Sequence, residues 1–269
     1  MTDKSQIEQL FLSGSRDENL GVYSELFSAK SGVEGQAGGV VTALLLSGLK
    51  KSVFDAAIVV CRKRDRYLAE VVVAENAEAV WAARGALFLK VNVLYKLKEL
   101  VVAGKKRIAL VCLPCQVQAA RKLQQALRRS NPDVEITLIG LFCFEAFTPE
   151  KLKTEVQKLT GEDIDRAEKV HIRKGQLVIQ IKGKTYTCKV AALNNAVLEA
   201  CRRCDDFTAA LADVSVGSVG SPTGYSTVIV RSEVGQRMLQ GLRFEKAETE
   251  KTELIKLCQL KRARKNFQK

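Results

Sequence analysis

The sequence predicts an α/β fold of mixed α+β character, with a central sheet covered by helices. Short apolar runs alternate with segments of helical spacing through the first half, which is typical of strands and helices that alternate along the chain. Near residue 169 the pattern changes to that of a β-hairpin, so the second half departs from this alternation. The composition is that of a globular protein, with 46% hydrophobic and 27% charged residues among 269.

The first half is expected to form a mixed or parallel sheet with helices packed on it. Strands are predicted over residues 56–61, 70–74, 107–113 and 135–143. Helices are predicted over residues 39–51, 91–103 and 115–129.

The second half carries the hairpin, a cysteine pair and a glycine-rich loop. The hairpin is expected over residues 169–187, with Lys182-Gly183-Lys184 as a turn. Residues 191–201 have helical character, the stretch 213–224 is rich in glycine and serine, and a last strand is expected over 226–231.

Three regions are expected along the chain. They are an N-terminal extension over residues 1–30, a main domain over 31–245, and a basic C-terminal helix or tail over 246–269. The tail has apolar residues spaced as on an amphipathic helix and ends in the basic run 261–265. We expect the tail to dock on a neighbour and to take no part in chemistry.

Charge and targeting patterns limit the classes of function. The formal net charge of +13 implies anionic partners: nucleic acid, a phosphorylated coenzyme, or acidic faces of other subunits. The first residues lack the basic start and apolar run of a secretory signal, and no apolar stretch is long enough to span a membrane. We therefore expect a cytoplasmic protein, in which eight cysteines indicate metal binding or redox chemistry and not disulfides.

Two CxxC pairs, Cys112/Cys115 and Cys201/Cys204, are the first candidates for a metal site. Thiolate pairs at this spacing are usual zinc ligands, so the two pairs together form a possible four-cysteine zinc site. Cys112, however, falls within a predicted strand, where the alternation of side chains turns it towards the core.

A second arrangement replaces Cys112 with Cys143, which ends another predicted strand. Ligands gather at the carboxyl ends of strands in open α/β sheets. The four thiolates of a cubane iron–sulfur cluster would then come from Cys115, Cys143, Cys201 and Cys204. The remaining cysteines have no partner nearby in sequence and are expected to be structural: Cys61, Cys188 and Cys258.

An ordered series of motifs connects these cysteines with glycine-containing segments. The motifs are GQAGGVVT at 35–42, PCQ at 114–116, GLFC at 140–143, CRRCDDF at 201–207, ADVSVGSVGSP at 212–222, Gly224, and YSTVI at 225–229. The series resembles the beta subunit family of coenzyme F420-reducing hydrogenase, which includes F420H2 dehydrogenase input subunits and formate dehydrogenase beta subunits. The resemblance spans nearly the whole chain.

The resemblance implies FAD, one [4Fe-4S] cluster held by the four cysteines of the second arrangement, and coenzyme F420 as a substrate stacked on the flavin. The cofactors supply the chemistry, so no side chain is expected to be catalytic. The residues expected at the flavin are Gly38, Gly39, Thr42, Lys90, Asn92, Ser218, Val219, Gly220, Tyr225, Ser226 and Thr227. The residues expected at the phosphate and glutamyl tail of F420 are Arg173, Lys174 and Lys189. The only histidine, His171, is expected to be structural.

Each flavin motif also has a physical interpretation. Gly38 and Gly39 open a helix, so bare backbone and helix-terminal N–H groups can approach the pyrophosphate or the ring. Gly220 likewise permits close approach of the backbone, and the hydroxyls of the neighbouring segments are expected to face a polar cofactor edge.

The chain departs from the family pattern beside the flavin. Arg84-Gly85-Ala86-Leu87 stands where the family usually has Gly-Ser/Thr-Lys-Tyr, so Arg84 and Lys90 are the candidates to replace the positive charge. Ala37 stands where an aspartate is common, and Ala146 where an asparagine is common. The cluster motifs match, whereas the flavin motifs are altered.

Three hypotheses follow for the function. The leading one is a subunit that transfers electrons between F420, as hydride, and a [4Fe-4S] relay through FAD, inside a larger redox complex with other redox subunits. The alternative is a divergent paralogue that keeps the cluster and acts as an electron relay or structural subunit without F420 reactivity. A basic, zinc-dependent nucleic-acid binder is disfavoured, because aromatic content is only 6% and no nucleic-acid motif accompanies the charge.

Overall fold

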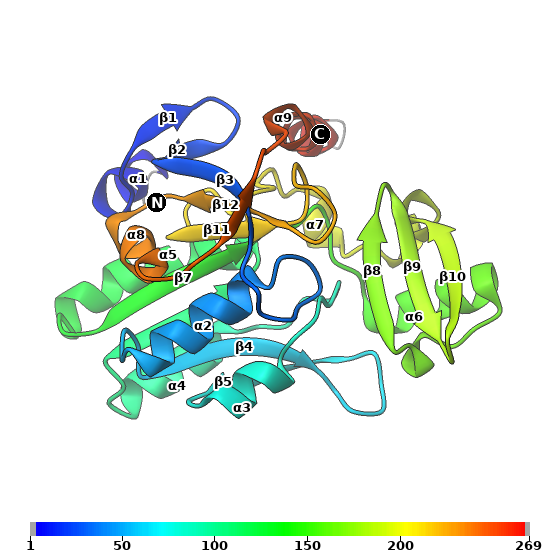
Figure 1. Ribbon diagram of the computed structural model, residues 1–269, viewed down its shortest axis with the longest axis horizontal. Helices are drawn as coiled ribbons and strands as arrows, with labels where there is room; N and C mark the ends of the chain where they lie inside the picture. Colours follow the sequence, from blue (N-terminus) through cyan, green and yellow to red (C-terminus); the bar gives the residue numbers. More distant parts are fainter. Residues whose placement is uncertain (1–3, 267–269) are drawn as a thin grey trace.

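The computed structural model describes residues 4–266 and is built on an eight-stranded mixed sheet (Figure 1). The strand order across the sheet is β13-β3-β12-β11-β7-β6-β4-β5. In chain order these strands are β3 (Glu25–Lys30), β4 (Ala56–Arg62), β5 (Ala69–Ala74), β6 (Arg107–Cys112), β7 (Glu135–Leu141), β11 (Val214–Gly217), β12 (Ser226–Val230) and β13 (Glu245–Ala247). The four central strands, β4, β6, β7 and β11, are parallel, and the outer strands pair antiparallel. The predicted α/β fold is confirmed.

Helices cover both faces of this sheet. Side chains from α2 (Val40–Lys50), α3 (Ala77–Ala82) and α8 (Glu233–Leu239) pack on one face. Side chains from α1 (Lys4–Phe11), α4 (Leu94–Val102) and α5 (Pro114–Ser130) pack on the other. Neighbouring residues of one strand enter different cores, as Leu110 and Val111 of β6 do. Strands buried on both faces have continuous apolar sequences, and this is why the central strands were predicted nearly to their ends.

A smaller antiparallel sheet forms a lobe beside the main body (Figure 1). It consists of β8 (Lys169–Arg173), β9 (Gln176–Ile181) and β10 (Lys184–Lys189), with α6 (Pro149–Thr160) packed on it and a 3-10 turn, η1 (Ile164–Arg166), before it. Lys182 and Gly183 both have positive φ, of 50° and 72°, as a two-residue hairpin turn requires, so the predicted turn is confirmed. A second such turn, at Lys174-Gly175, was not predicted and makes the hairpin three-stranded.

The segment after the lobe is helical in two pieces. Residues 191–201, predicted to have helical character, form a 3-10 segment, η2 (Val190–Ala196), and a short helix, α7 (Glu199–Arg202). The helix is interrupted because the backbone between them is extended and pairs with the segment after β7: Leu198 donates to the Ala146 carbonyl. The glycine- and serine-rich stretch 213–224 contains β11 and is not only a loop. The last predicted strand is present as β12.

Both ends of the described chain pack into the body. The region 1–30 was expected as an extension. Its described part, residues 4–30, contributes a hairpin of β1 (Ser15–Asp17) and β2 (Gly21–Tyr23) and then β3, which lies between β12 and β13. The C-terminal helix is α9 (Lys251–Asn266), whose Leu254, Cys258 and Lys261 are buried against the same chain. The expectation that this tail docks on a neighbour is therefore wrong for its buried face. Within residues 4–266, no helix has the length and apolarity needed to cross a membrane.

Candidate functional site

The carboxyl ends of β6, β7 and β11 meet at one edge of the central sheet. These strands are parallel neighbours, so the residues that follow them emerge on the same side. Cys115 follows β6 in the first turn of α5, Cys143 follows β7 by two residues, and the glycine-rich loop follows β11. The structure thus brings two predicted cluster ligands and the predicted flavin loop to one edge.

The second cysteine pair reaches this edge from α7. The Cys204 N–H donates to the Cys201 carbonyl at an N···O distance of 3.3 Å, and the Cys143 N–H donates to the Phe207 carbonyl at 2.9 Å. These bonds hold the segment of the pair against the end of β7. The thiols of Cys115, Cys201 and Cys204 all act electrostatically on that of Cys143, so the four proposed ligands lie close together.

Burial raises the pKa of two of these thiols, Cys115 and Cys143. Desolvation raises the pKa of the Cys143 thiol to about 12, and it also raises the pKa of Cys115. The neighbouring thiols raise both pKa values further, whereas Lys261 opposes the rise at Cys143 and Lys90 opposes it at Cys115. Four thiolates at such proximity require a positively charged group among them, and an iron–sulfur core is such a group.

The donor set bears on the kind of metal centre. Within residues 4–266, no three His, Cys, Asp or Glu side chains are arranged to hold a single metal ion. Four cysteine thiolates are the donors that a cubane iron–sulfur core takes, and a zinc ion can take the same four donors.

The other cysteines differ in their surroundings. Cys112 ends β6 with 2% of its surface exposed and packs in the core beside α5, so the expectation that it is buried is confirmed. Cys188 packs in the core of the lobe, and Cys258 lies on the buried face of α9 with Leu20 and Phe207, in line with structural roles. Cys61 instead lines a cleft, which the sequence did not indicate.

Helix α2 starts at the predicted flavin motif. Gly39 has a φ of 67° and precedes the helix, whose first N–H groups donate no hydrogen bond to a capping side chain. Thr42 is half-buried in the first turn. An uncapped helix start with bare backbone before it fits the pyrophosphate of FAD.

Two of the motif glycines are also required by the packing of the chain itself. A Cβ at Gly38 would collide with the backbone of Ala29 and Ser226, and a Cβ at Gly220 would meet Glu250 and Leu254. Both glycines therefore make room for the protein's own chain, which a sequence motif cannot distinguish from room for a cofactor.

The hydroxyl groups expected at the cofactor are also engaged by the protein. Ser226 Oγ accepts from the Gly38 N–H at 3.0 Å, Thr227 Oγ1 donates to the Val219 carbonyl at 2.7 Å, and Tyr225 Oη donates to Glu245. The Ser221 hydroxyl donates to the Ser218 carbonyl. The Asn92 side chain accepts from the Leu94 N–H at the start of α4. These side chains shape the loops that would contact the flavin.

The two cations expected to replace the missing lysine have other partners. Arg84 pairs with Glu34 at 3.1 Å and lies over the Trp81 ring at 4.9 Å. Lys90 hydrogen-bonds the Cys115 side chain. Lys90 therefore lies at the thiol group, and Arg84 lies at the cleft described next.

A cleft of about 460 Å³ separates the lobe from the N-terminal half of the sheet. Its walls are residues 34–36, 60–62, 81–87 and 168–170. Gln36 crosses it: its Nε2 donates to the Val170 carbonyl at 2.9 Å, and its Oε1 accepts from the Ala86 N–H at 2.7 Å. The sequence assigned no role to Gln36, although a polar residue among glycines before a helix can indicate a residue that holds neighbouring segments together.

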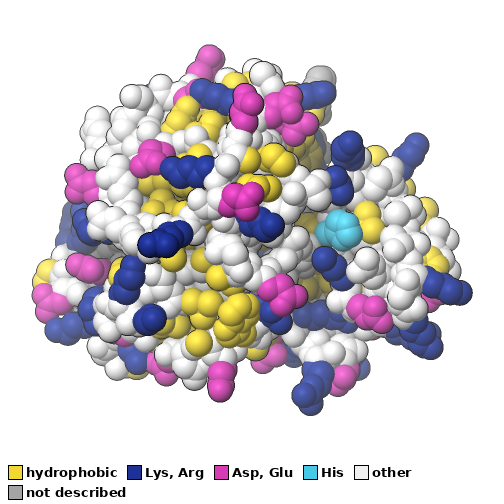
Figure 2. Space-filling model, viewed as in Figure 1, with side chains coloured by type: hydrophobic (Ala, Val, Ile, Leu, Met, Phe, Trp, Pro, Cys, Tyr) yellow, Lys and Arg dark blue, Asp and Glu magenta, His cyan; other side chains and the backbone are white. Residues whose placement is uncertain are grey.

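His171 of β8 lies on the side of the lobe that faces the main body (Figure 2, cyan). Its Nδ1 is buried and has no hydrogen-bond partner among the described residues. Desolvation lowers the pKa of His171 below its ordinary value of 6.5, and Lys169 and Arg173 lower it further. The imidazole is therefore neutral at pH 7.

This lowered pKa makes stability depend on pH. Below pH 6.5, His171 of the unfolded chain binds a proton, whereas His171 of the folded chain stays neutral. The free energy of unfolding that is present above pH 6.5 therefore decreases as the pH falls towards the lowered pKa. We expect His171→Gln to lose less stability than the wild type between about pH 7.5 and about pH 5.5, measured as urea midpoints. Equal losses in both proteins would contradict this assignment.

The three residues expected at the F420 tail lie at one end of the lobe. Arg173 and Lys174 are at the β8–β9 turn, and Lys189 pairs with Gln176 just after it. Arg173 Nη2 donates to Thr223 Oγ1 at 2.6 Å, which joins this end of the lobe to the glycine-rich loop. The structure therefore brings the three cations close to the proposed flavin region.

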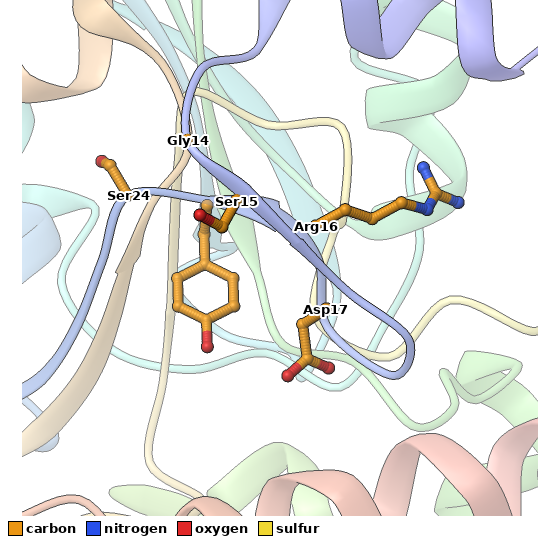
Figure 3. A pocket seen from close by; sticks show the side chains of 6 residues that line it. Gly14, Ser15, Arg16, Asp17 and Ser24 are labelled. Carbon is orange, nitrogen blue, oxygen red and sulfur yellow. The ribbon is translucent and has the colours of Figure 1, made fainter.

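A second hollow, of about 380 Å³, lies at the β1–β2 hairpin (Figure 3). Arg16 and Asp17 point in different directions from β1. Asp17 pairs with Lys251 at 2.7 Å and accepts the N–H groups of Asn19 and Leu20. Its carboxylate is thus occupied in holding α9.

Two family profiles match this chain. The profile described as the N-terminal part of the coenzyme F420 hydrogenase/dehydrogenase beta subunit matches residues 26–98. The profile described as the C terminus of the same beta subunit matches residues 105–254.

Individual proteins are similar over most of the chain. The coenzyme F420-dependent sulfite reductase of Methanocaldococcus jannaschii is 35% identical over 261 residues, which are 92% of this chain but 41% of the reductase, so the chain spans about two fifths of that protein. Coenzyme F420 hydrogenase subunit beta of Methanothermobacter thermautotrophicus is 32% identical over 230 residues, 82% of each chain. A chain in the solved structure of the xenon-derivatised F420-reducing [NiFe] hydrogenase complex from Methanosarcina barkeri matches with a TM-score of 0.87 at 28% identity, covering 94% of both chains.

Proposed function

Because the chain belongs to the coenzyme F420 hydrogenase/dehydrogenase beta subunit family, we propose that it transfers electrons between F420 and a [4Fe-4S] cluster through FAD. It would do so in the cytoplasm as the oxidoreductase subunit of a larger redox complex. The observation that carries the proposal is the convergence of four thiols at the sheet edge where the glycine-rich loop begins. One cluster and one flavin form a relay, and a relay needs an electron partner in another subunit.

The cysteine edge provides a site suited to electron transfer. Phe207 packs near Phe142 and Phe144, with ring centroids 5.5 Å and 6.4 Å apart, next to the proposed ligands Cys143 and Cys204. These rings keep water from the thiols, and the backbone N–H groups at the start of α5 can hydrogen-bond sulfur. The residues proposed to hold the cluster are Cys115, Cys143, Cys201 and Cys204.

The neighbouring region is proposed to hold the flavin and the substrate. When bound, FAD exchanges a hydride with F420 and single electrons with the cluster. The chain's own part is to bind and orient: the start of α2 binds the pyrophosphate, and loop 218–227 borders the ring. Arg173, Lys174 and Lys189 bind the anionic tail of F420.

The direct test is oxidation of reduced F420 by the purified protein, reconstituted with iron, sulfide and FAD, with a dye as electron acceptor. We expect oxidation that requires both iron and FAD. Protein that binds neither iron nor FAD would contradict the proposal.

The cations of the lobe give a prediction for substrate affinity. We expect Lys174→Gln to raise the KM for F420 about fivefold, the equivalent of ~1 kcal/mol for one partly exposed charge contact, while iron and flavin content stay unchanged. The KM should also rise with salt, because ions screen this attraction. Lys184→Gln is the control, since Lys184 lies at the opposite turn of the same lobe. Equal KM values for Lys174→Gln and Lys184→Gln would show that this end of the lobe is not part of the substrate site.

A second candidate function is an electron-relay or structural subunit without F420 reactivity. It is favoured by Arg84, which is held by Glu34 and Trp81 and so does not replace the missing lysine. Protein that binds iron and FAD but does not oxidise reduced F420 would decide for this candidate.

A further inference from the structure

Helix α9 lies against the backbone of the proposed cluster ligands. The ammonium group of Lys261 donates to the Cys143 carbonyl. Arg264 Nη2 donates to the Cys201 carbonyl at 3.0 Å and to the Phe144 carbonyl at 3.1 Å. Two cations from successive turns of one helix therefore reach the thiol site.

The two cations differ in how their charge is neutralised. Arg264 Nη1 lies 2.5 Å from the Glu145 carboxylate, so its charge has a partner. Lys261 has only 1% of its surface exposed, and no described carboxylate pairs with it. The ion pairs of α9 among the described side chains are Lys251 with Asp17 and Arg264 with Glu145.

A buried ammonium without an anion is costly. Removing a cation from water carries a large free-energy penalty unless an opposite charge lies nearby. The Cys143 carbonyl supplies a dipole but no charge. The charge of Lys261 acts on the Cys143 thiol. The group of four thiols can supply the missing negative charge, because a cubane bound by four thiolates is an anion in both its oxidation states.

The position of Lys261 is fixed by the rest of α9. Cys258 and Leu254 are buried on the same face, about one and two turns before it. Lys251 pairs with Asp17 at 2.7 Å, and Arg262 donates to the Asn19 carbonyl at 2.7 Å. The ammonium is thus held at Cys143 and does not turn out to solvent.

We propose that Lys261 is the counter-ion of the cluster and raises its reduction potential. The proposal rests on the cluster proposed above at Cys115, Cys143, Cys201 and Cys204. Reduction adds one negative charge to the cluster, so a fixed cation beside it stabilises the reduced form more than the oxidised form. Because the ammonium is buried, salt screens this effect only weakly.

The test is the reduction potential of the reconstituted full chain, measured by a redox titration followed by electron paramagnetic resonance. We expect Lys261→Met to shift the potential to a more negative value, and Lys261→Arg to bring it back towards wild type. Lys256→Met is the matched control, since Lys256 is an exposed lysine of the same helix, and its potential should equal that of wild type. The shift in Lys261→Met should persist at high salt.

A second readout separates a counter-ion from a structural lysine. In iron-free protein, Lys261→Met removes an unneutralised charge and should not lower the melting temperature, whereas in reconstituted protein it should. A structural lysine would lower both temperatures. If Lys261→Met does not take up iron but Lys261→Arg does, the charge is needed for assembly, which also supports the proposal.

The two proposals fail in different ways. If Lys261→Met carries the same iron as wild type with the same potential, or if Lys261→Arg shifts the potential as far as Lys261→Met does, the counter-ion role is overturned and the cluster stands. If wild type takes up no iron and sulfide at all, the cluster is overturned and the counter-ion with it.

Discussion

Cys143→Ala is expected to lose the iron–sulfur cluster, whereas Cys112→Ala should keep iron near the wild-type content. A cubane needs all four thiolates, and Cys143 is the proposed ligand that β7 delivers to the sheet edge. Cys112 is buried in the core beside α5 and is not among the thiols that act on Cys143. Iron and acid-labile sulfide per chain are the measurements.

Comparing Cys112→Ala with Cys143→Ala separates loss of the cluster from a general loss of folding. Both variants remove one sulfur atom from a strand or strand end, and Cys112 is the more buried of the two. A loss of folding alone would therefore affect Cys112→Ala at least as strongly. If Cys112→Ala loses the metal and Cys143→Ala keeps it, the site is the one formed by the two CxxC pairs.

Asp213→Ala is expected to lower the free energy of unfolding by about 3–5 kcal/mol, the cost of leaving a buried charge unpaired. Asp213 Oδ1 lies 2.9 Å from Arg121 Nη2, and both side chains are nearly inaccessible to solvent. The contact is an ion pair without hydrogen-bond alignment. Asp213 also accepts from Leu138 N–H at 2.7 Å and from Ser232 Oγ at 2.6 Å. The alanine variant leaves these two donors and the Arg121 guanidinium without this partner.

Urea unfolding gives the measurement, and two further variants give the controls. Asp133→Ala breaks an exposed pair with Lys106 and should cost less than about 1 kcal/mol. Arg121→Met with Asp213→Ala should be more stable than Asp213→Ala alone, because no unpaired charge remains. A loss at Asp213 no greater than at Asp133 would show that the buried pair does not hold α5 to the sheet.

Patterns within short stretches determined much of the fold. The strands around Ile108 and Leu138 were predicted because side chains buried on both faces of a parallel sheet give continuous apolar runs. The turn at Lys182-Gly183 followed from the chain's local composition between two alternating segments. Placing Cys115 and Cys143 at one edge followed from the rule that parallel strands end on the same side.

The tertiary structure decided what depends on contacts distant in sequence. Residues 191–201 have the composition of a helix, but the backbone near Val197 is drawn into pairing with the segment after β7. The motif alone indicated that Gly38 and Gly220 contact a cofactor. Only the tertiary structure shows that they also make room for the backbone of Ala29 and Glu250.

The C-terminal helix shows the same division most clearly. Its amphipathic spacing was sufficient to predict a helix with one buried face, because periodicity is a property of the local sequence. Which surface covers that face depends on where β1, β2 and the end of β7 come together in space. Folding brings Lys261 to Cys143 across 118 residues of sequence, and no local pattern records that contact.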